Sequence, residues 1–535
     1  KQNRILNISI LAPAKETITI PVTCVEAGRW GRHDSGYRRE RDRILRSRLR
    51  AEFEEADHIA FMRMRRAKHV AVTQSLKAAG SRYASQAEVW SEIEDLDGDM
   101  GTRSPTRAMR DSYEQRRQSL EEYVQALPMV KDQVGVAFAL NNRLVGLDLF
   151  DHPQLVVSDT VQALADLASA NRSGSAARLV AITGSSGKTT VREMTGAILA
   201  GMGPTLVTEG NLNNHIGVPL TLFRLTPDHQ FGAIELGASG LGEIAHTVSI
   251  TRPQVAILTN AGQAHLEGFG SYQNIVLAKG EIIDGVPADR AVVLNRDDPA
   301  FDQWHARAGQ RRVLGVSRMG HPGADYRAEA IMATDQGFEF LVLGPDNWRC
   351  HLVLGLPGEH NITNALLALA ACRELGATDQ QVQSGLMQVE AVKGRLQVLK
   401  PAPDLTLIDD SYNANPASMK AALDVLASYP APRLAVLGAM AELGDEANEL
   451  HRQVGEHARA RGIEKVMVVG AGGNGYGTGF GDETEFFPSH EQAVDAIVAG
   501  RSGAMTVLVK GSRSSAMDRV VEGIQKKVKN PCCSG

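Results

Sequence analysis

The feature that most constrains this chain is a segment in which a short apolar run is followed by a loop of Gly and Ser and then by a helical pattern. Arg178–Ile182 is expected to form a buried strand, and apolar residues recur at helical spacing over Val191–Leu199. Between them, residues 183–190 read TGSSGKTT. A strand, a flexible loop and a helix in this order bring backbone N–H groups and the positive end of the helix to one point. The segment therefore predicts a phosphate-binding loop in an α/β domain.

The residues of this loop can be given individual roles. Lys188 is expected to reach the β- and γ-phosphates of a nucleotide, and the Thr189 hydroxyl to bind Mg²⁺. The common nucleotide-binding pattern has a longer spacing between its glycines, so an ordinary Gly/Ser turn is the alternative. The strand and helix on either side favour the phosphate loop. The residues expected to hold ATP are Gly184, Ser185, Ser186, Gly187, Lys188, Thr189 and Thr190.

Composition excludes several classes of protein. The 535 residues are enough for about three or four domains, and 43% hydrophobic with 22% charged residues is typical of a globular chain. No apolar run reaches the roughly 18 residues of a membrane span. A net charge of −5 gives no reason to expect nucleic acid as a partner, and five scattered cysteines suit a reducing compartment. We therefore expect a cytoplasmic monomer without a membrane span.

The chain divides into three stretches with different patterns. Residues 1–150 combine Arg-rich helical patterning with strands and predict an α+β domain. Residues 151–355 alternate short β-branched runs with helices, which is typical of a mostly parallel sheet covered on both faces. After a turn rich in Pro and Gly, residues 356–535 resume this alternation and predict a Rossmann-like C-terminal α/β domain. The expected strands beyond the phosphate loop are Phe231–Leu236, Val255–Thr259, Ala291–Leu294, Leu405–Ile408, Leu434–Leu437, Lys465–Val469 and Thr506–Val509.

Polar residues follow the strands that flank the expected phosphate loop, at the edge of a parallel sheet where ligands bind. Glu235 ends one strand and is suited to bind Mg²⁺, with a solvated strand end as the alternative. His265 comes after the next strand and is expected to face the metal, unless it is a core or surface histidine. Lys279 lies on the helix that follows, and its spacing alone favours an ordinary surface lysine.

Motifs between residues 154 and 523 resemble those of the Mur ligases, in particular the branch that joins D-alanyl-D-alanine to a UDP-N-acetylmuramoyl tripeptide for peptidoglycan. The matching strings are TGSSGKTT, TEGNLNNHIGVPLTL, ELGASGLGEIAHTVSITRP, AHLEGFGS, AKGEI, LPGEHNITNALLA, DDSYNANPASM, MAELG and VKGSRSSAM. The resemblance implies an ATP-dependent, ADP-forming ligase that works through an acyl phosphate with two Mg²⁺ ions. It also implies that Lys279 is carbamylated and binds metal together with Thr189, Glu235 and His265.

The same resemblance assigns the remaining site residues. It implies a catalytic set of Lys188, Glu235, His265 and Lys279. The residues implied to contact ATP outside the phosphate loop are Asn295, Asn361, Asn364, Arg395, Asp410, Tyr412 and Asn413. Those implied to contact the other substrates are Asn213, Asn214, Asn415, Lys510 and Arg513. From the residues alone, DDSYNANP is equally well explained by a turn followed by a helix cap, and Lys510 and Arg513 by solvated charges.

The first 150 residues do not match a Mur ligase, which normally begins with a domain for the uridine end of the nucleotide sugar. Segments between residues 7 and 150 instead resemble the ARPP-type domain, a family without an assigned biochemistry. Their pattern predicts strands at 17–25, 135–140 and 144–148, the last two joined over Asn141-Asn142, and helices at 41–76 and 109–126. Glu26, Arg29 and Trp30 form either a polar site or a structural Trp beside an ion pair.

A ligase without its uridine-binding domain is expected to hold a sugar nucleotide weakly, because contacts remote from the reacting carboxylate help to bind and orient it. Two alternatives to the peptidoglycan ligase therefore stay open. One is a Mur-like ligase that acts on another carboxylate, and the other is a non-catalytic fusion or scaffold protein. The intact catalytic set argues against a loss of catalysis.

Overall fold

The computed structural model describes residues 4–11, 17–24, 139–141, 154–156, 159–263, 266–335, 337–501 and 503–529. The chain forms two compact units, residues 1–175 with 219–227 and residues 176–218 with 228–535. Within the described ranges, no helix combines the length and apolar character that crossing a membrane requires. Four features predicted for the first stretch fall outside the described residues: the helices at 41–76 and 109–126, the strand at 144–148, and the cluster of Glu26, Arg29 and Trp30.

The first unit contains a four-stranded sheet with the order β1-β2-β4-β3. β1 (Arg4–Leu11) pairs antiparallel with β2 (Thr17–Cys24), which confirms the strand predicted at residues 17–25. β4 (Gln154–Val156) pairs antiparallel with β2 and parallel with β3 (Ala139–Asn141). The last residue of β3 was expected in a turn and is instead part of this strand.

The second unit begins with a nine-stranded sheet in the order β13-β12-β11-β10-β9-β8-β5-β7-β6. Neighbours from β6 to β11 pair parallel, and β12 and β13 add antiparallel at one edge. The mostly parallel sheet predicted for this stretch is thus confirmed, together with its expected strands. The strands are β5 (Arg178–Thr183), β6 (Thr205–Val207), β7 (Phe231–Glu235), β8 (Val255–Leu258), β9 (Ala291–Asn295), β10 (Arg312–Ser317), β11 (Tyr326–Thr334), β12 (Gly337–Leu343) and β13 (Arg349–Leu354).

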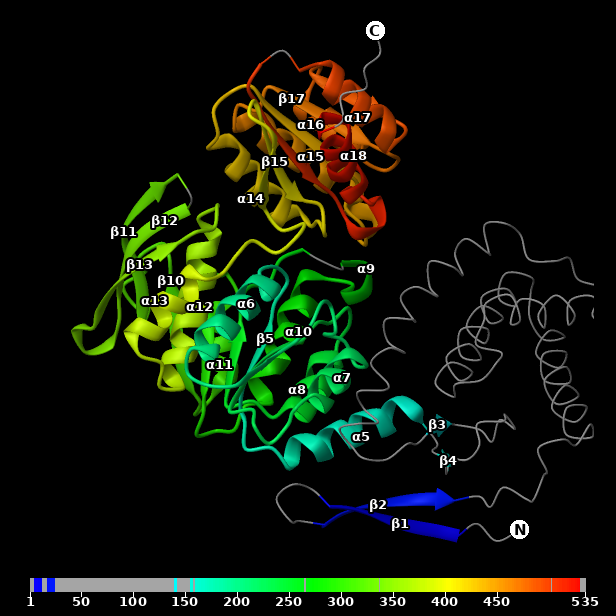
Figure 1. The fold of residues 1–535 in the computed structure, drawn as a ribbon, viewed down its shortest axis with the longest axis vertical. Coiled ribbons are helices and arrows are strands. Elements are labelled where there is room, and N and C mark those ends of the chain that lie inside the picture. Colours follow the sequence, from blue (N-terminus) through cyan, green and yellow to red (C-terminus); the bar gives the residue numbers. More distant parts are fainter. Residues whose placement is uncertain are drawn as a thin grey trace, which may run out of the picture. The chain divides into compact units, whose positions relative to one another are not determined.

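Helices α12 and α13 belong to the core of this nine-stranded sheet (Figure 1), although the sequence analysis assigned them to the last domain. Apolar side chains of α12 pack with those of α6 and with strands β8 to β11. The chain passes from the nine-stranded to the six-stranded sheet between residues 388 and 396, which lies after the boundary expected between residues 355 and 356. The helices up to this point are α5 (Thr160–Ser173), α6 (Lys188–Ala200), α7 (Gly217–Phe223), α8 (Glu243–Thr251), α9 (Leu266–Phe269), α10 (Tyr272–Asp284), α11 (Phe301–Ala308), α12 (His360–Glu374) and α13 (Asp379–Met387).

The last part of the chain forms a six-stranded sheet in the order β14-β15-β19-β16-β17-β18, parallel except for β14. Two apolar clusters, one on each face, join the sheet to α14, α15 and α16 and to α17 and α18. This confirms the predicted C-terminal α/β domain. Its elements are β14 (Gln397–Ala402), β15 (Leu405–Asp410), α14 (Pro416–Ala427), β16 (Arg433–Gly438), α15 (Ala447–Ala460), β17 (Lys465–Val469), α16 (Asn474–Phe480), β18 (Thr484–Phe487), α17 (His490–Ala499), β19 (Met505–Lys510) and α18 (Asp518–Lys529).

Candidate active site

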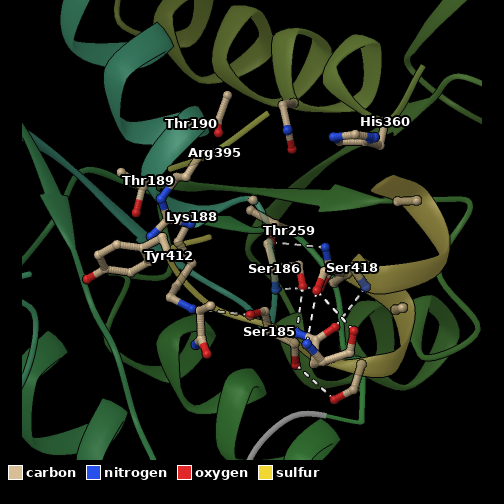
Figure 2. A pocket seen from close by; sticks show the side chains of 18 of the residues that line it. Ser185, Ser186, Lys188, Thr189, Thr190, Thr259, His360, Arg395, Tyr412 and Ser418 are labelled. Carbon is tan, nitrogen blue, oxygen red and sulfur yellow. Dashed lines mark hydrogen bonds between the residues drawn. The ribbon is translucent and has the colours of Figure 1, made fainter. Parts of the chain in front are cut away.

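The second unit holds a cavity of about 650 Å³ at the carboxyl ends of parallel strands from both of its sheets (Figure 2). Most residues that the sequence assigned to a site line this single cavity. They are Ser185, Ser186, Gly187, Lys188, Thr189, Thr190, Asn213, Asn214, Glu235, Asn295, Asn361, Asn364, Arg395, Asp410, Tyr412, Asn413, Asn415 and Lys510. Side chains more than 300 residues apart in the sequence therefore face one space.

The two glycines of the phosphate loop occupy positions that admit no larger residue. The backbone angle φ is +144° at Gly184 and +82° at Gly187, where L side chains are rare. A Cβ atom at Gly184 would lie 1.9 Å from Oγ1 of Thr259. A Cβ atom at Gly187 would lie 2.7 Å from Oδ1 of Asn364. The loop thus lies close against the end of β8 and helix α12, which explains why both positions are glycine.

Lys188 is the first residue of α6, and its side chain folds back over the loop. Its Nζ atom donates to the carbonyl of Gly184 at 2.8 Å and to that of Ser185 at 3.4 Å. Burial lowers the pKa of Lys188, nearby Glu235 opposes this shift, and Arg395 adds to it. The amine therefore lies at the cavity wall with carbonyl partners that a phosphate oxygen can replace.

Glu235 ends β7 and is 2% exposed. Three groups donate hydrogen bonds to its carboxylate: Thr189 Oγ1 at 3.0 Å, Arg192 Nη1 at 3.2 Å and Asn213 Nδ2 at 2.8 Å. Among the described residues, no cluster of three or more His, Cys, Asp or Glu could hold a metal by itself. A hydroxyl and a carboxylate beside a phosphate loop instead fit Mg²⁺, which takes few protein oxygens and completes its shell with phosphate and water.

Lys279 lies on α10 behind the cavity wall and is 2% exposed. Its Nζ atom donates to the carbonyl of Ala238, a lining residue, at 3.0 Å. Burial, aided by the charge of Lys188 and opposed by Glu243 and Glu281, lowers the pKa of Lys279 to about 7. The interpretation as an ordinary surface lysine is therefore wrong, and a large share of the amine is neutral at neutral pH.

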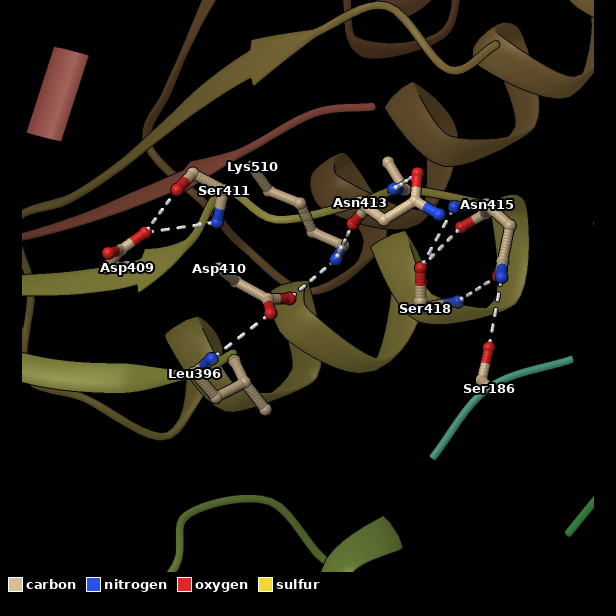
Figure 3. Close-up of polar contacts among 10 residues, drawn as sticks. Ser186, Leu396, Asp409, Asp410, Ser411, Asn413, Asn415, Ser418 and Lys510 are labelled. Atoms are coloured by element: carbon tan, nitrogen blue, oxygen red, sulfur yellow. Dashed lines mark hydrogen bonds and ion pairs between the residues drawn. The ribbon is translucent and has the colours of Figure 1, made fainter. Parts of the chain in front are cut away.

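Asp410 and Lys510 end the neighbouring strands β15 and β19 and form a buried ion pair of 2.6 Å (Figure 3). Lys510 Nζ also donates to the carbonyl of Asn413 at 2.9 Å, and Asp410 accepts from the N–H of Leu396 at 3.1 Å. Burial raises the pKa of Asp410, and the charge of Lys510 opposes this shift. Lys510 is 3% exposed and is not an ordinary solvated charge.

Two guanidinium groups lie near the aromatic ring of Tyr412. The Cζ atom of Arg395 lies 4.4 Å from the ring centroid and that of Arg513 5.8 Å, both within cation–π range. Arg395 lines the cavity, whereas the side chain of Arg513 is 70% exposed and lies 3.7 Å from Asp518. Of the two arginines assigned to the site, only Arg395 reaches the cavity, and the solvated interpretation of Arg513 fits its position better.

Asn415 performs the capping role that was the alternative interpretation of its motif. Its Oδ1 atom accepts from the N–H of Ser418 at 2.9 Å and so caps α14. Its Nδ2 atom also donates to Oγ of Ser186 at 3.0 Å, which links the last sheet to the phosphate loop. The structural and the functional interpretation therefore hold for the same side chain.

Three other predicted asparagines fold their own loops while they line the cavity. Asn214 Oδ1 accepts from the N–H of Gly217 at 2.8 Å, and Asn295 Oδ1 accepts from that of Asp297 at 3.1 Å. Asn361 donates from Nδ2 to the carbonyl of Pro357 at 2.7 Å. A carboxamide has two donors and two acceptor sites, so each can also meet a ligand.

Some residues that were predicted to belong to the site do not line the cavity, and some lining residues were not predicted. His265 lies outside the described residues, and Gly184, Lys279 and Arg513 do not line the cavity. The lining also contains polar residues that were not predicted from the sequence, among them Asn211, Asn260, Asp298 and His360. Asn260 comes directly after a predicted strand, and Asp298 comes four residues after the end of another. Asn211 and His360 lie inside matched motifs, so the sequence carried a signal for all four.

Two of these missed residues are titratable. Asp298 accepts from the N–H of Ala261 at 3.0 Å and from that of Ala300 at 2.8 Å. Burial raises the pKa of Asp298, and both hydrogen bonds oppose the shift. Burial, aided by Lys510, lowers the pKa of His360 to about 4, so its ring is neutral at physiological pH.

Three protein families match different parts of the chain. The Mur ligase middle domain matches residues 182–372, and the Mur ligase glutamate ligase domain matches residues 394–513. The ARG and Rhodanese-Phosphatase-superfamily-associated Protein domain, ARPP-1, matches residues 1–168. The gap between the two Mur ligase matches, residues 373–393, overlaps the segment at which the fold changes sheets.

Individual relatives agree with these matches. The UDP-N-acetylmuramoyl-tripeptide–D-alanyl-D-alanine ligase of Escherichia coli is 44% identical over 398 residues, 73% of this chain and 86% of the relative. That of Haemophilus influenzae is 40% identical, covering 70% and 83%. A crystal structure of MurF from Acinetobacter baumannii superposes with a TM-score of 0.68 at 33% identity, covering 73% and 85%. MurF ligase from Thermotoga maritima in complex with ADP has a TM-score of 0.65 at 27% identity, covering 71% and 87%. The chain therefore belongs to the Mur ligase family, in the branch of the UDP-N-acetylmuramoyl-tripeptide–D-alanyl-D-alanine ligases.

Proposed function

We propose that this protein is an ATP-dependent, ADP-forming ligase that adds D-alanyl-D-alanine to a UDP-N-acetylmuramoyl tripeptide in the cytoplasm, as a step of peptidoglycan precursor synthesis. The observation that carries this proposal is the convergence of the phosphate loop, the Thr189–Glu235 pair and the strand ends of the last sheet on one cavity. The tripeptide and the dipeptide are proposed as substrates because the relatives are named as ligases of these two compounds.

The reaction consists of two displacements. A free carboxylate is a poor electrophile, so a carboxylate oxygen of the tripeptide first attacks the γ-phosphorus of ATP and ADP leaves. The dipeptide amine then attacks the carbonyl carbon of the acyl phosphate; the amide bond forms, phosphate leaves and the amine loses a proton. Lys188 would stabilise the charge on the transferred phosphoryl group, and no protein nucleophile is required.

The metal would be held by oxygen ligands beside the phosphate loop. Thr189 and Glu235 would hold one Mg²⁺, and His265 with carbamylated Lys279 would hold a second. When bound, the ions neutralise charge on the phosphate oxygens. The protein's own part is to keep the Glu235 carboxylate in place through Arg192 and Asn213.

The environment of Lys279 supports the proposed carbamylation. A neutral amine can add to CO₂, with formation of an N–C bond and release of one proton, and a pKa of about 7 makes that neutral form abundant. The positive charge of Lys188 favours the resulting anion, whereas Glu243 and Glu281 disfavour it. Metal binding would add the stabilisation that the anion needs.

The remaining lining residues would divide between the substrates. Those proposed to contact ATP are Asn295, Asn361, Asn364, Arg395, Asp410, Tyr412 and Asn413. Asn213, Asn214, Asn415 and Lys510 are proposed to contact the tripeptide or the dipeptide. Both groups line the same cavity, which supports a role for them in substrate binding.

A second candidate is a Mur-like ligase that acts on a different carboxylate. The ARPP-1 match at residues 1–168 favours it, because that match stands in place of the expected uridine-binding domain. Such an enzyme would share the phosphate loop and the metal ligands and differ in the acyl donor.

The test uses the full chain with ATP, Mg²⁺, the UDP-linked tripeptide and D-alanyl-D-alanine. We expect phosphate release that depends on the dipeptide, with a product mass equal to the sum of both substrates minus water. Absence of dipeptide-dependent release at all substrate concentrations would contradict the proposal. Equal kcat/KM for a muramoyl tripeptide without UDP would favour the second candidate.

A further inference from the structure

The side chain of Asn260 pairs with the backbone of the phosphate loop as a second peptide group would. The N–H of Ser186 donates to Asn260 Oδ1 at 3.0 Å, and Asn260 Nδ2 donates to the carbonyl of Ser186 at 3.1 Å. A carboxamide carries the same donor and acceptor as a peptide unit, so one side chain satisfies both backbone groups of one residue. Asn260 directly follows β8, the strand beside β5.

Neighbouring contacts continue this pairing along the loop. The N–H of Ser185 donates to the carbonyl of Asn260 at 3.0 Å, and Ser185 Oγ donates to that of Gly262 at 3.1 Å. Oγ1 of Thr259 adds a hydrogen bond of 2.6 Å to the carbonyl of Ser186 (Figure 2). Residues 259–262 thus bind both backbone groups of Ser186 and the N–H of Ser185, and the side chain of Lys188 from α6 binds the carbonyls of Gly184 and Ser185.

This arrangement decides which groups remain for a phosphate. The N–H groups of Ser185 and Ser186 are both committed to Asn260. The anion-binding surface therefore starts at Gly187 and continues into the first turn of α6, whose N–H groups have no partner within the helix. A loop with two glycines is otherwise free to adopt many conformations, and each would aim these groups differently.

We infer that Asn260 is a positioning residue for nucleotide binding: its amide fixes Ser186 so that the N–H groups from Gly187 onward point at the phosphates. The inference rests on the proposed function only as far as nucleotide binding. In this role Asn260 acts through Ser186 and touches no reacting atom. Without the Asn260 side chain, the loop must be ordered when the nucleotide binds, and the free energy of this ordering lowers the affinity for the nucleotide.

Two substitutions test the inference. Asn260→Ala removes both hydrogen bonds to Ser186, and Asn260→Asp keeps an acceptor for the N–H but places a carboxylate oxygen against the Ser186 carbonyl. Gln273→Ala is the matched control, because it removes an exposed amide contact of 2.7 Å to Gln303. The measurements are the Kd for ADP with Mg²⁺ by calorimetry, at a temperature where circular dichroism shows all variants folded, and the KM for ATP and for the dipeptide.

For Asn260→Ala we expect the Kd for ADP and the KM for ATP to rise about ten- to thirty-fold, as the loss of two hydrogen bonds predicts. The Kd for ADP and the KM for ATP should rise more for Asn260→Asp. The KM for the dipeptide should stay unchanged in both variants, and all three constants should stay at their wild-type values in Gln273→Ala. Asn260→Ala combined with Thr259→Val should weaken binding by less than the product of the single effects, because both act on the Ser186 carbonyl.

Two results would overturn the inference. Unchanged ADP affinity with a lowered melting temperature would show that Asn260 serves only stability. Single effects that multiply in the double variant would show that Asn260 acts independently of the Ser186 carbonyl. Failure of the wild-type protein to bind ADP would instead contradict the proposed function, and the inference with it.

Discussion

The side-chain amide of Asn415 donates to Oγ of Ser186 at 3.0 Å, and the other end of the same amide caps α14. The side chain of Asn415 thus stabilises α14, which packs on the six-stranded sheet, and also binds the phosphate loop of the nine-stranded sheet. These two tasks use different atoms, Nδ2 for the loop and Oδ1 for the cap, so substitutions can separate them.

Asn415→Asp should separate these tasks. The carboxylate keeps the acceptor that caps α14 but replaces the Nδ2 donor by a negatively charged oxygen beside the phosphate loop, so we expect near wild-type stability with a lowered kcat/KM for ATP. Asn415→Ala loses both and should also unfold about 1 kcal/mol more easily. Urea unfolding and phosphate-release kinetics measure the two effects. Wild-type kinetics for Asn415→Asp would show that the contact with Ser186 has no role in turnover.

Lys188→Met should lower kcat at least about a hundred-fold, as expected when one group that stabilises transition-state charge is removed. The circular dichroism spectrum should stay unchanged. Lys465→Met is the control, because this lysine forms a partly exposed ion pair with Glu485 at 2.6 Å. Turnover that survives in Lys188→Met would refute the role of Lys188 at the phosphates.

Lys279 predicts a pH dependence of stability. Its pKa falls from 10.5 in the unfolded chain to about 7 in the folded protein. Between these values the unfolded chain binds more protons, so the contribution of Lys279 to the free energy of unfolding rises with pH. The slope is at most about 1.4 kcal/mol per pH unit.

The measurement compares wild type with Lys279→Met by urea unfolding at several pH values above 7, in buffer free of CO₂. The difference in unfolding free energy should grow in favour of wild type as the pH rises. A difference that is independent of pH would mean that Lys279 keeps an ordinary pKa in the folded protein.

The ion pair of Asp410 and Lys510 should be strongly coupled. The Lys510 side chain is 3% and the Asp410 side chain 13% exposed, so Asp410→Asn or Lys510→Met leaves a largely buried charge without its partner and should cost about 3–5 kcal/mol of stability. The double variant leaves no such charge and should lose much less than the sum. Unfolding free energies of the four proteins form the test, and additive losses would argue against coupling.

Much of the fold could be predicted because its signals are local. The strand, glycine loop and helix around Lys188 lie in one continuous segment, and the buried parallel strands read as short apolar runs. Helix α12 shows the limit of this reasoning. Its sequence is apolar nearly all round, which predicts burial but does not reveal which of two sheets buries it.

The site divides in the same way. Residues at strand ends, such as Glu235 and Asp410, could be placed because parallel strands end at one edge. The position of Lys279 could not be predicted, because the spacing of residues along a helix does not show which of its faces packs against the rest of the protein. Asn260 was missed since its partner Ser186 lies 74 residues away and the contact is to backbone, which leaves no trace in side-chain patterns.

Every described residue that lines the cavity falls between Ser185 and Lys510, whereas the ARPP-1 match ends at residue 168. The groups that would make the amide bond are thus encoded apart from the segment that varies between this chain and its relatives. Recombination upstream of the phosphate loop can therefore exchange the first segment of such a chain without changing any described residue of this cavity.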